Sequence, residues 1–280
     1  ILGEAPEVKN FFVGAGFNSM GIASAGGAGK ALDEWIVEGE ATRDMWPVDI
    51  RRFASFHGND DWLSERIAET LGLHYVMPWP NRELQSGRPL RRSPIYERFK
   101  EKGACFGSKM GWERPLWFAR NRQAPELDYS WGKPGWFANV AAEHDAARNG
   151  VALFDQSSFS KLLVEANDVG VAAGACVYTG LLNERGGYES DLTVTRLGAD
   201  RFLLVTGSAQ TTRDQDWIRK NLEPNEHVSV TDIAASLAVL SVMGPKSRDL
   251  LSWLTSADLS SEAFAFGTSR EIGLGQAVVR

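Results

Sequence analysis

An acidic residue, Asp191, stands just after a glycine-rich turn, where a segment of alternating polar and apolar residues begins. Gly186 and Gly187 form the turn, and Tyr178 precedes it. Consecutive glycines let the backbone approach a flat ligand closely, and a carboxylate beside them can hold an amine or steer a proton. A strand-edge acid that only faces water explains the same residues, so the pattern by itself leaves both interpretations open.

A second candidate lies in residues 11–22, where an apolar run ends in Gly14 and Gly16 and a helical pattern begins at Gly21. A helix N-terminus offers free N–H groups and a partial positive charge to an electron-rich group. The dinucleotide-binding spacing requires a third glycine where Ser19 stands, so the pyrophosphate fingerprint is absent. Taken alone, these residues favour packing of a small-residue helix against a sheet over a ligand site.

Other reactive residue types are sparse. Cys105, Cys176 and four scattered histidines lack the spacing of metal ligands, so we expect no metal site. The two thiols fit core positions better than a catalytic role. Glu184 and Glu189 flank the glycine turn and are interpreted as solvated charges.

The elements that must hold these residues follow from the spacing of apolar and turn-forming residues. Helices are predicted over residues 21–38, 60–73, 94–102, 138–148, 168–177, 209–222 and 245–254. Strands are predicted over residues 11–13, 151–154, 161–165, 191–197, 201–206, 228–233 and 237–242. A turn at 198–200 joins two of these strands as a hairpin. We expect Gly39 to end the first helix and Ser208 to cap the helix after the hairpin.

Residues 104–136 are rich in Trp and Phe, with Gly and Pro between them. Such a stretch usually seals a contact between domains, and we expect that role here.

Composition limits the classes of partner. The chain of 280 residues is 43% hydrophobic and 24% charged, as in ordinary globular proteins. Its net charge of −6 disfavours nucleic acid and anionic membranes as partners. No apolar run approaches the roughly 20 residues of a membrane helix. Two cysteines indicate a reducing compartment, the cytoplasm or, in a eukaryote, the mitochondrial matrix. The first residue is Ile1 and residues 276–280 are strand-like, so we expect a fragment of a longer protein.

Residues 11–30, 87–94 and 111–118 resemble the dimethylglycine/sarcosine dehydrogenase family. The resemblance implies FAD as a cofactor, with the pyrimidine edge of its ring against a helix N-terminus. The matching positions are Ser19, Met20, Gly21, Ile22 and Ala23, which would act through their backbone. N–H donors there would stabilise the negative charge of reduced flavin.

Residues 178–194 are similar to the tetrahydrofolate-binding domain of the glycine-cleavage T-protein, an aminomethyltransferase. The resemblance implies a functional role for Asp191 and a folate contact for Tyr178. Gly186 and Gly187 would admit the flat ligand. Val205, at the end of the second hairpin strand, is a lesser candidate for contact with folate.

These observations predict an α+β chain in three parts. Residues 1–45 would be the tail of a flavin oxidoreductase domain, 46–135 a connecting segment, and 136–280 the first part of a folate domain. The parent protein would oxidise an N-methyl amine, sarcosine or dimethylglycine, and pass the one-carbon unit to tetrahydrofolate. This chain lacks the family's dinucleotide-binding motif, so we expect it to be inactive alone. The pattern defines no oligomeric state.

Two other interpretations stay open. A non-catalytic relative, like the regulatory subunit of pyruvate dehydrogenase phosphatase, would share most of these motifs. A folate-dependent aminomethyltransferase is less favoured, because it has no use for residues 1–118.

Overall fold

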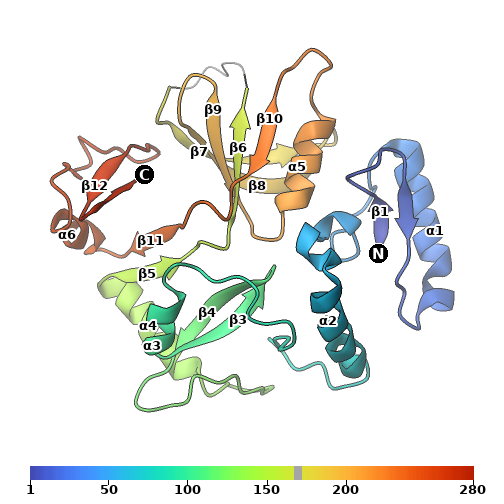
Figure 1. Ribbon diagram of the computed structural model, residues 1–280, viewed down its shortest axis with the longest axis horizontal. Coiled ribbons are helices and arrows are strands. Elements are labelled where there is room, and N and C mark those ends of the chain that lie inside the picture. Colours follow the sequence, from blue (N-terminus) through green and yellow to red (C-terminus); the bar gives the residue numbers. More distant parts are fainter. Residues whose placement is uncertain (167–171) are drawn as a thin grey trace. The chain divides into compact units, whose positions relative to one another are not determined.

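Helices and strands of the chain fall into two units in the computed structural model, which describes residues 1–166 and 172–280 (Figure 1). Unit 1 comprises residues 1–59 and 209–226, and unit 2 comprises residues 60–208 and 227–280. The mixture of helices and antiparallel strands confirms the predicted α+β class. Within the described ranges, no helix is both long and apolar enough to cross a bilayer.

Unit 1 is built on a long helix beside a two-stranded sheet (Figure 1). Its elements are β1 (Leu2–Glu4), β2 (Phe12–Gly14), α1 (Gly21–Glu38), two 3-10 helices (Ile50–Arg52 and Ser55–Gly58) and α5 (Thr211–Lys220). Trp35 on α1 is buried against Gly3 of β1, where a Cβ atom would lie 2.7 Å from the indole ring. Gly3 has a φ of +116°, so this position needs glycine for its backbone as well as for the contact.

The predicted helix over residues 21–38 and its end at Gly39 are confirmed. Gly39 adopts a left-handed φ of 79°, and its N–H donates to the carbonyl of Trp35. Asn18 and Ser19 before the helix also have positive φ values, 43° and 68°. A tight backbone turn therefore sets where α1 begins.

A buried network of charges joins α5 to the N-terminal part of unit 1. Arg51 Nη2 lies 2.7 Å from Asp49 Oδ2, and its Nη1 lies 3.2 Å from Asp216 Oδ2 on α5. Lys220, also on α5, lies 2.6 Å from Glu4 Oε2. The pairs of Arg51 with Asp216 and of Lys220 with Glu4 hold together segments that are more than 150 residues apart in the sequence.

The predicted cap of α5 is wrong. The helix begins at Thr211, after Gln210, with no side-chain hydrogen bond at its cap position. Ser208 instead donates its hydroxyl to Oγ of Ser158 at 3.2 Å. Because that hydroxyl is engaged within unit 2, it does not serve the helix of unit 1.

Unit 2 contains the remaining elements. They are α2 (Asp60–Leu73), α3 (Tyr96–Glu101), β3 (Ala104–Lys109), β4 (Trp112–Phe118), α4 (Phe137–Asn149), β5 (Ala152–Asp155), β6 (Ser160–Glu165), β7 (Cys176–Leu182), β8 (Tyr188–Arg196), β9 (Arg201–Thr206), β10 (Ser229–Asp232), β11 (Leu240–Met243), α6 (Ser247–Ser252), β12 (Ile272–Leu274) and β13 (Ala277–Val279). The predicted helix over residues 60–73 is confirmed to its bounds.

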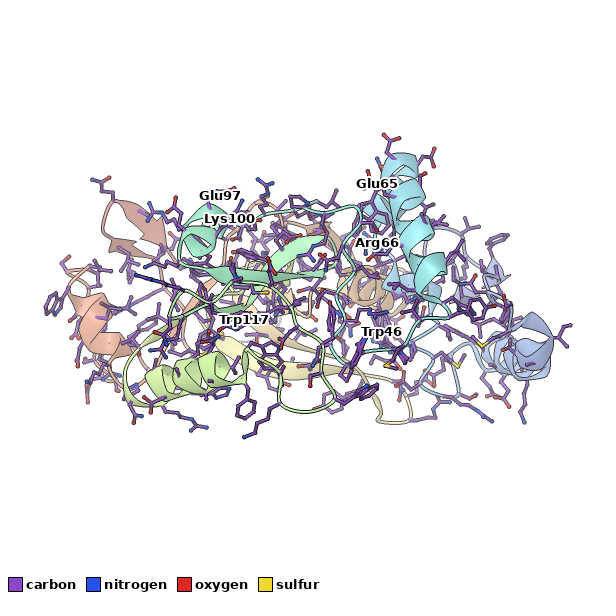
Figure 2. All side chains as sticks on the ribbon, turned by 90° about the horizontal axis from the view of Figure 1, so that it is seen from below. Trp46, Glu65, Arg66, Glu97, Lys100 and Trp117 are labelled. Carbon is purple, nitrogen blue, oxygen red and sulfur yellow. The ribbon has the colours of Figure 1, made fainter. Side chains whose placement is uncertain are left out.

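The aromatic stretch after residue 104 contains a β-hairpin that its composition did not predict. β3 and β4 pair antiparallel, with Cys105 opposite Trp117. Both side chains are buried, and Trp117 is labelled in Figure 2. Burial raises the pKa of the Cys105 thiol to about 11, which fits the expected core role.

Five strands of unit 2 form one antiparallel sheet in the order β10-β6-β9-β8-β7, with β7 at an edge (Figure 1). The predicted hairpin is confirmed as β8 and β9. Residues 168–171 of the helix expected over 168–177 lie outside the described residues. The same expectation is wrong at Cys176 and Val177, because they pair with β8 as part of β7.

Candidate functional site

The register of the sheet places three of the predicted folate residues on one face. Thr193 on β8 lies opposite Tyr178 on β7 and opposite Val205 on β9. Directly opposed residues share a face, and so do residues two apart along a strand. Asp191, two residues before Thr193, is therefore on the same face as Tyr178 and Val205. Leu192 is on the other face and is 3% exposed.

The Tyr178 hydroxyl donates a hydrogen bond of 2.9 Å to Oδ2 of Asp191. Both residues are exposed, and Tyr178 is 70% exposed. The hydrogen bond raises the pKa of the Tyr178 phenol, because the carboxylate favours the protonated hydroxyl. Among the described residues, no donor reaches Oδ1 of Asp191. The pair thus offers an oriented carboxylate with one oxygen open to a ligand.

The glycine turn is organised by Asn183, which sequence reasoning missed. Its Oδ1 accepts hydrogen bonds from the backbone N–H of Arg185 at 3.1 Å and of Gly187 at 2.8 Å. Gly186 has a φ of 76°, which favours glycine. An Asn before a Gly-Gly pair is the signal that could have found this turn.

Glu189 is not the solvated charge that we expected. It is half-buried, and its Oε1 accepts a hydrogen bond of 3.0 Å from Nδ2 of Asn183. The contact ties the start of β8 to the turn. Glu184 is exposed, as expected of a solvated charge.

A buried cation lies beside Val205 on the neighbouring strand. Lys161 on β6 is fully buried, and its Nζ donates to the carbonyls of Ser157 at 2.8 Å and Leu237 at 2.9 Å. Desolvation lowers the pKa of this ammonium group. The strand pattern gives no signal for a buried lysine, since Lys161 was expected only as a strand residue.

The predicted flavin segment lies in unit 1, at the start of α1. Met20 is the cap residue, without a side-chain hydrogen bond, and the first turn from Gly21 to Ser24 is uncharged. Ser19, Met20, Ile22 and Ala23 are exposed and Gly21 is half-buried. The N–H of Met20 donates to the carbonyl of Phe17 at 3.0 Å. Among the described residues, the N–H groups of the first helical residues, Gly21, Ile22 and Ala23, have no hydrogen-bond acceptor and are accessible to an electron-rich group.

A cavity of about 500 Å³ adjoins this helix end, lined in part by Phe17, Met20, Ser24 and Ala28. A Cβ atom on Gly21 would lie 3.7 Å from Cβ of Phe17, an ordinary contact, and its φ is outside the left-handed region. The cavity is also lined by Lys30, Glu34 and Arg43, two cations and one anion. The free donor groups and this excess of positive charge fit the electron-rich edge of a flavin ring. In the described part of the chain, no group of three or more His, Cys, Asp or Glu could hold a metal ion.

Comparison with known protein families gives two matches. Residues 95–280 match the GCVT N-terminal domain, the family of the glycine-cleavage T-protein. The chain belongs to this family. Residues 38–93 match the central domain of FAD-dependent oxidoreductases. This GCVT-family chain therefore carries parts of both domain types that the sequence predicted.

Three relatives align along almost all of the GCVT-family chain. It is 43% identical to 4-methylaminobutanoate oxidase (formaldehyde-forming) of Paenarthrobacter nicotinovorans, over 99% of the chain and 35% of that protein. It is 34% identical to mouse mitochondrial sarcosine dehydrogenase, over 100% of the chain and 36% of that protein. It is 33% identical to the mouse mitochondrial pyruvate dehydrogenase phosphatase regulatory subunit, over 99% of the chain and 34% of that protein. The chain thus spans about a third of the length of these relatives.

Proposed function

We propose that the protein containing this chain oxidises an N-methyl amino acid with FAD and transfers the oxidised carbon to tetrahydrofolate. The observation that carries the proposal is the exposed Tyr178–Asp191 pair, in a chain that matches a GCVT domain and an FAD oxidoreductase central domain. The names of two relatives, a methylaminobutanoate oxidase and a sarcosine dehydrogenase, support this class of substrate.

FAD, when bound, would accept a hydride from the N-methyl carbon of the substrate. The residues of this chain that would face it are Ser19, Met20, Gly21, Ile22 and Ala23. The N–H groups of Gly21, Ile22 and Ala23, at the start of α1, would be the donors. Such donors stabilise negative charge on the ring edge, and the uncharged first turn adds no repulsion.

Loss of hydride leaves an iminium group, which water hydrolyses to formaldehyde. Capture by tetrahydrofolate forms bonds from two folate nitrogens to the iminium carbon and breaks the carbon–nitrogen double bond to the amine. Each folate nitrogen loses its N–H proton: one proton goes to the departing amine, and the other is released. In this proposal Asp191 holds the pterin and accepts the released proton. We assign contacts with folate to Tyr178, Gly186, Gly187 and Val205.

The proposal is tested on the longer protein that contains this chain. Purified protein is mixed without oxygen with sarcosine, dimethylglycine or 4-methylaminobutanoate, and its absorption near 450 nm is followed. We expect a flavin spectrum that bleaches with at least one of the three amines. Omitting tetrahydrofolate should then yield free formaldehyde, and adding it should lower that yield.

A second candidate is a regulatory role, because the mouse phosphatase regulatory subunit is 33% identical over 99% of the chain. That role predicts no bleaching with any of the three amines. A protein without bound flavin would favour it over the oxidase.

A further inference from the structure

We propose that Tyr188 is a stacking platform for the pterin ring of a reduced folate, beside the carboxylate of Asp191. The inference rests on the proposed function, because it adds a residue to the same site. Sequence reasoning gave Tyr188 no role.

The ring of Tyr188 lies against the backbone of Gly180 on the neighbouring strand. A Cβ atom on Gly180 would come within 2.3 Å of Cε1, 2.8 Å of Cδ1 and 3.0 Å of Cζ of the ring. Three ring atoms at such distances place the ring over Gly180, with no room for a methyl group. A shift in the β7–β8 register at Leu181 and Leu182 accompanies this arrangement, with Leu182 opposite Tyr188.

This position brings the ring next to the carboxylate. Gly180 is the residue directly opposite Asp191 in the β7–β8 register. The ring that covers Gly180 therefore adjoins Asp191, whose Oδ2 is held by Tyr178 at 2.9 Å.

The outer side of the Tyr188 ring is open. Tyr188 is 71% exposed although one side of its ring is against Gly180. Tyrosine usually buries much of its ring, and an exposed aromatic beside an oriented carboxylate suits a ligand with a flat ring. Stacking would use the ring, and the open Oδ1 of Asp191 would accept an N–H at the ligand edge. A pterin has both features, a flat heteroaromatic system and N–H donors on its rim.

The longer protein that contains this chain is titrated by calorimetry with 5-formyltetrahydrofolate, a stable reduced folate. We expect Tyr188→Leu to raise the Kd about tenfold, because leucine still covers Gly180 but offers no aromatic face. Tyr188→Phe keeps the ring, and its Kd should stay within about twofold of wild type. Gly180→Ala displaces the ring and should weaken binding although Tyr188 is retained.

Tyr75→Ala is the matched control, because Tyr75 is an 84% exposed tyrosine elsewhere in unit 2. Its Kd should equal that of wild type. An unchanged Kd for Tyr188→Leu, with binding weakened by Asp191→Asn, would overturn the platform and leave the folate site standing. Equal losses in Tyr188→Phe and Tyr188→Leu would also overturn it, because the hydroxyl would then carry the contact. A wild-type longer protein that binds no folate would overturn the folate part of the proposed function and the platform with it.

Discussion

The hydrogen bond between Tyr178 and Asp191 is the contact that defines the folate site at the scale of single residues. It raises the pKa of the Tyr178 phenol above its ordinary value of about 10. We expect the Tyr178 signal of protein labelled with ¹³C at tyrosine Cζ to titrate at a higher pH than in the Asp191→Asn variant. The Tyr178→Phe variant identifies the signal of Tyr178, because that signal is missing from its spectrum.

The raised pKa of Tyr178 determines how the contribution of this pair to the stability of the protein changes with pH. The contribution of this hydrogen bond to stability is complete below pH 10 and is lost as the pH rises through the raised pKa. An identical midpoint in wild type and Asp191→Asn would show that the two side chains do not pair in solution.

Arg51 is the charge on which unit 1 depends most. Its guanidinium contacts Asp49 at 2.7 Å and Asp216 at 3.2 Å, and all three side chains are less than a tenth exposed. Arg51→Met would leave two buried carboxylates without this partner, so we expect the free energy of unfolding to fall by about 3–5 kcal/mol. Urea unfolding followed by tryptophan fluorescence measures the change.

The control for Arg51 is an exposed ion pair of similar length. Arg92 and Glu97 are 3.3 Å apart, with side chains 50% and 64% exposed. Arg92→Ala should change the free energy of unfolding by less than about 1 kcal/mol. Similar losses in the free energy of unfolding for Arg51→Met and Arg92→Ala would contradict the claim that burial makes the loss of Arg51 costly.

At the scale of elements, the N-terminal end of α1 is the part of the proposed flavin site that a single substitution tests. Gly21→Val adds a branched side chain at the helix end, where the backbone N–H groups are proposed to meet the flavin. We expect amine oxidation by the longer protein to slow about 100-fold, the effect of losing one such donor. Stopped-flow flavin reduction measures the rate.

The chain alone provides the control for Gly21→Val. The added Cβ would meet Cβ of Phe17 at 3.7 Å and encounter no left-handed backbone strain. The free energy of unfolding should therefore change little. Unchanged flavin content and unchanged reduction rate in the longer protein would remove residues 19–23 from the flavin site.

Some elements of the fold can be predicted from the residues of the segment itself, and others depend on pairing with another strand. α1 was predicted to its end because Gly39 marks a left-handed cap, and the β8–β9 hairpin because a turn separates two alternating segments. Cys176 and Val177 were assigned to a helix because the small residues before them resemble one, whereas pairing with β8 decides their structure. Strand pairing is a contact between distant residues, and local composition does not record it.

In the candidate folate site, too, some residues could be predicted from the sequence and others depend on neighbouring strands. Tyr178, Asp191 and Val205 were proposed from the sequence, and the register of three strands places them on one face. Tyr188 and Lys161 were missed because their roles depend on the neighbouring strands, through Gly180 for one and two loop carbonyls for the other.

At the scale of the whole molecule, each of the two units is made of two separate stretches of the chain. α5 follows β9 directly in sequence, yet it belongs to unit 1, where Asp216 and Lys220 form ion pairs with Arg51 and Glu4. A division into three consecutive segments, 1–45, 46–135 and 136–280, does not place α5 in one unit with residues 1–59. We retain those three ranges as a proposal for the parts of the parent protein to which the segments belong.

The central claim is that the oxidised carbon passes to tetrahydrofolate at a site separate from the flavin. The most direct test compares wild type and Asp191→Asn in the longer protein, with N-methyl amine and tetrahydrofolate, and measures flavin reduction, methylenetetrahydrofolate and formaldehyde together. We predict unchanged flavin reduction, about 100-fold slower methylenetetrahydrofolate formation, and a matching rise in formaldehyde. Equal losses of flavin reduction and methylenetetrahydrofolate, without a rise in formaldehyde, would contradict the claim.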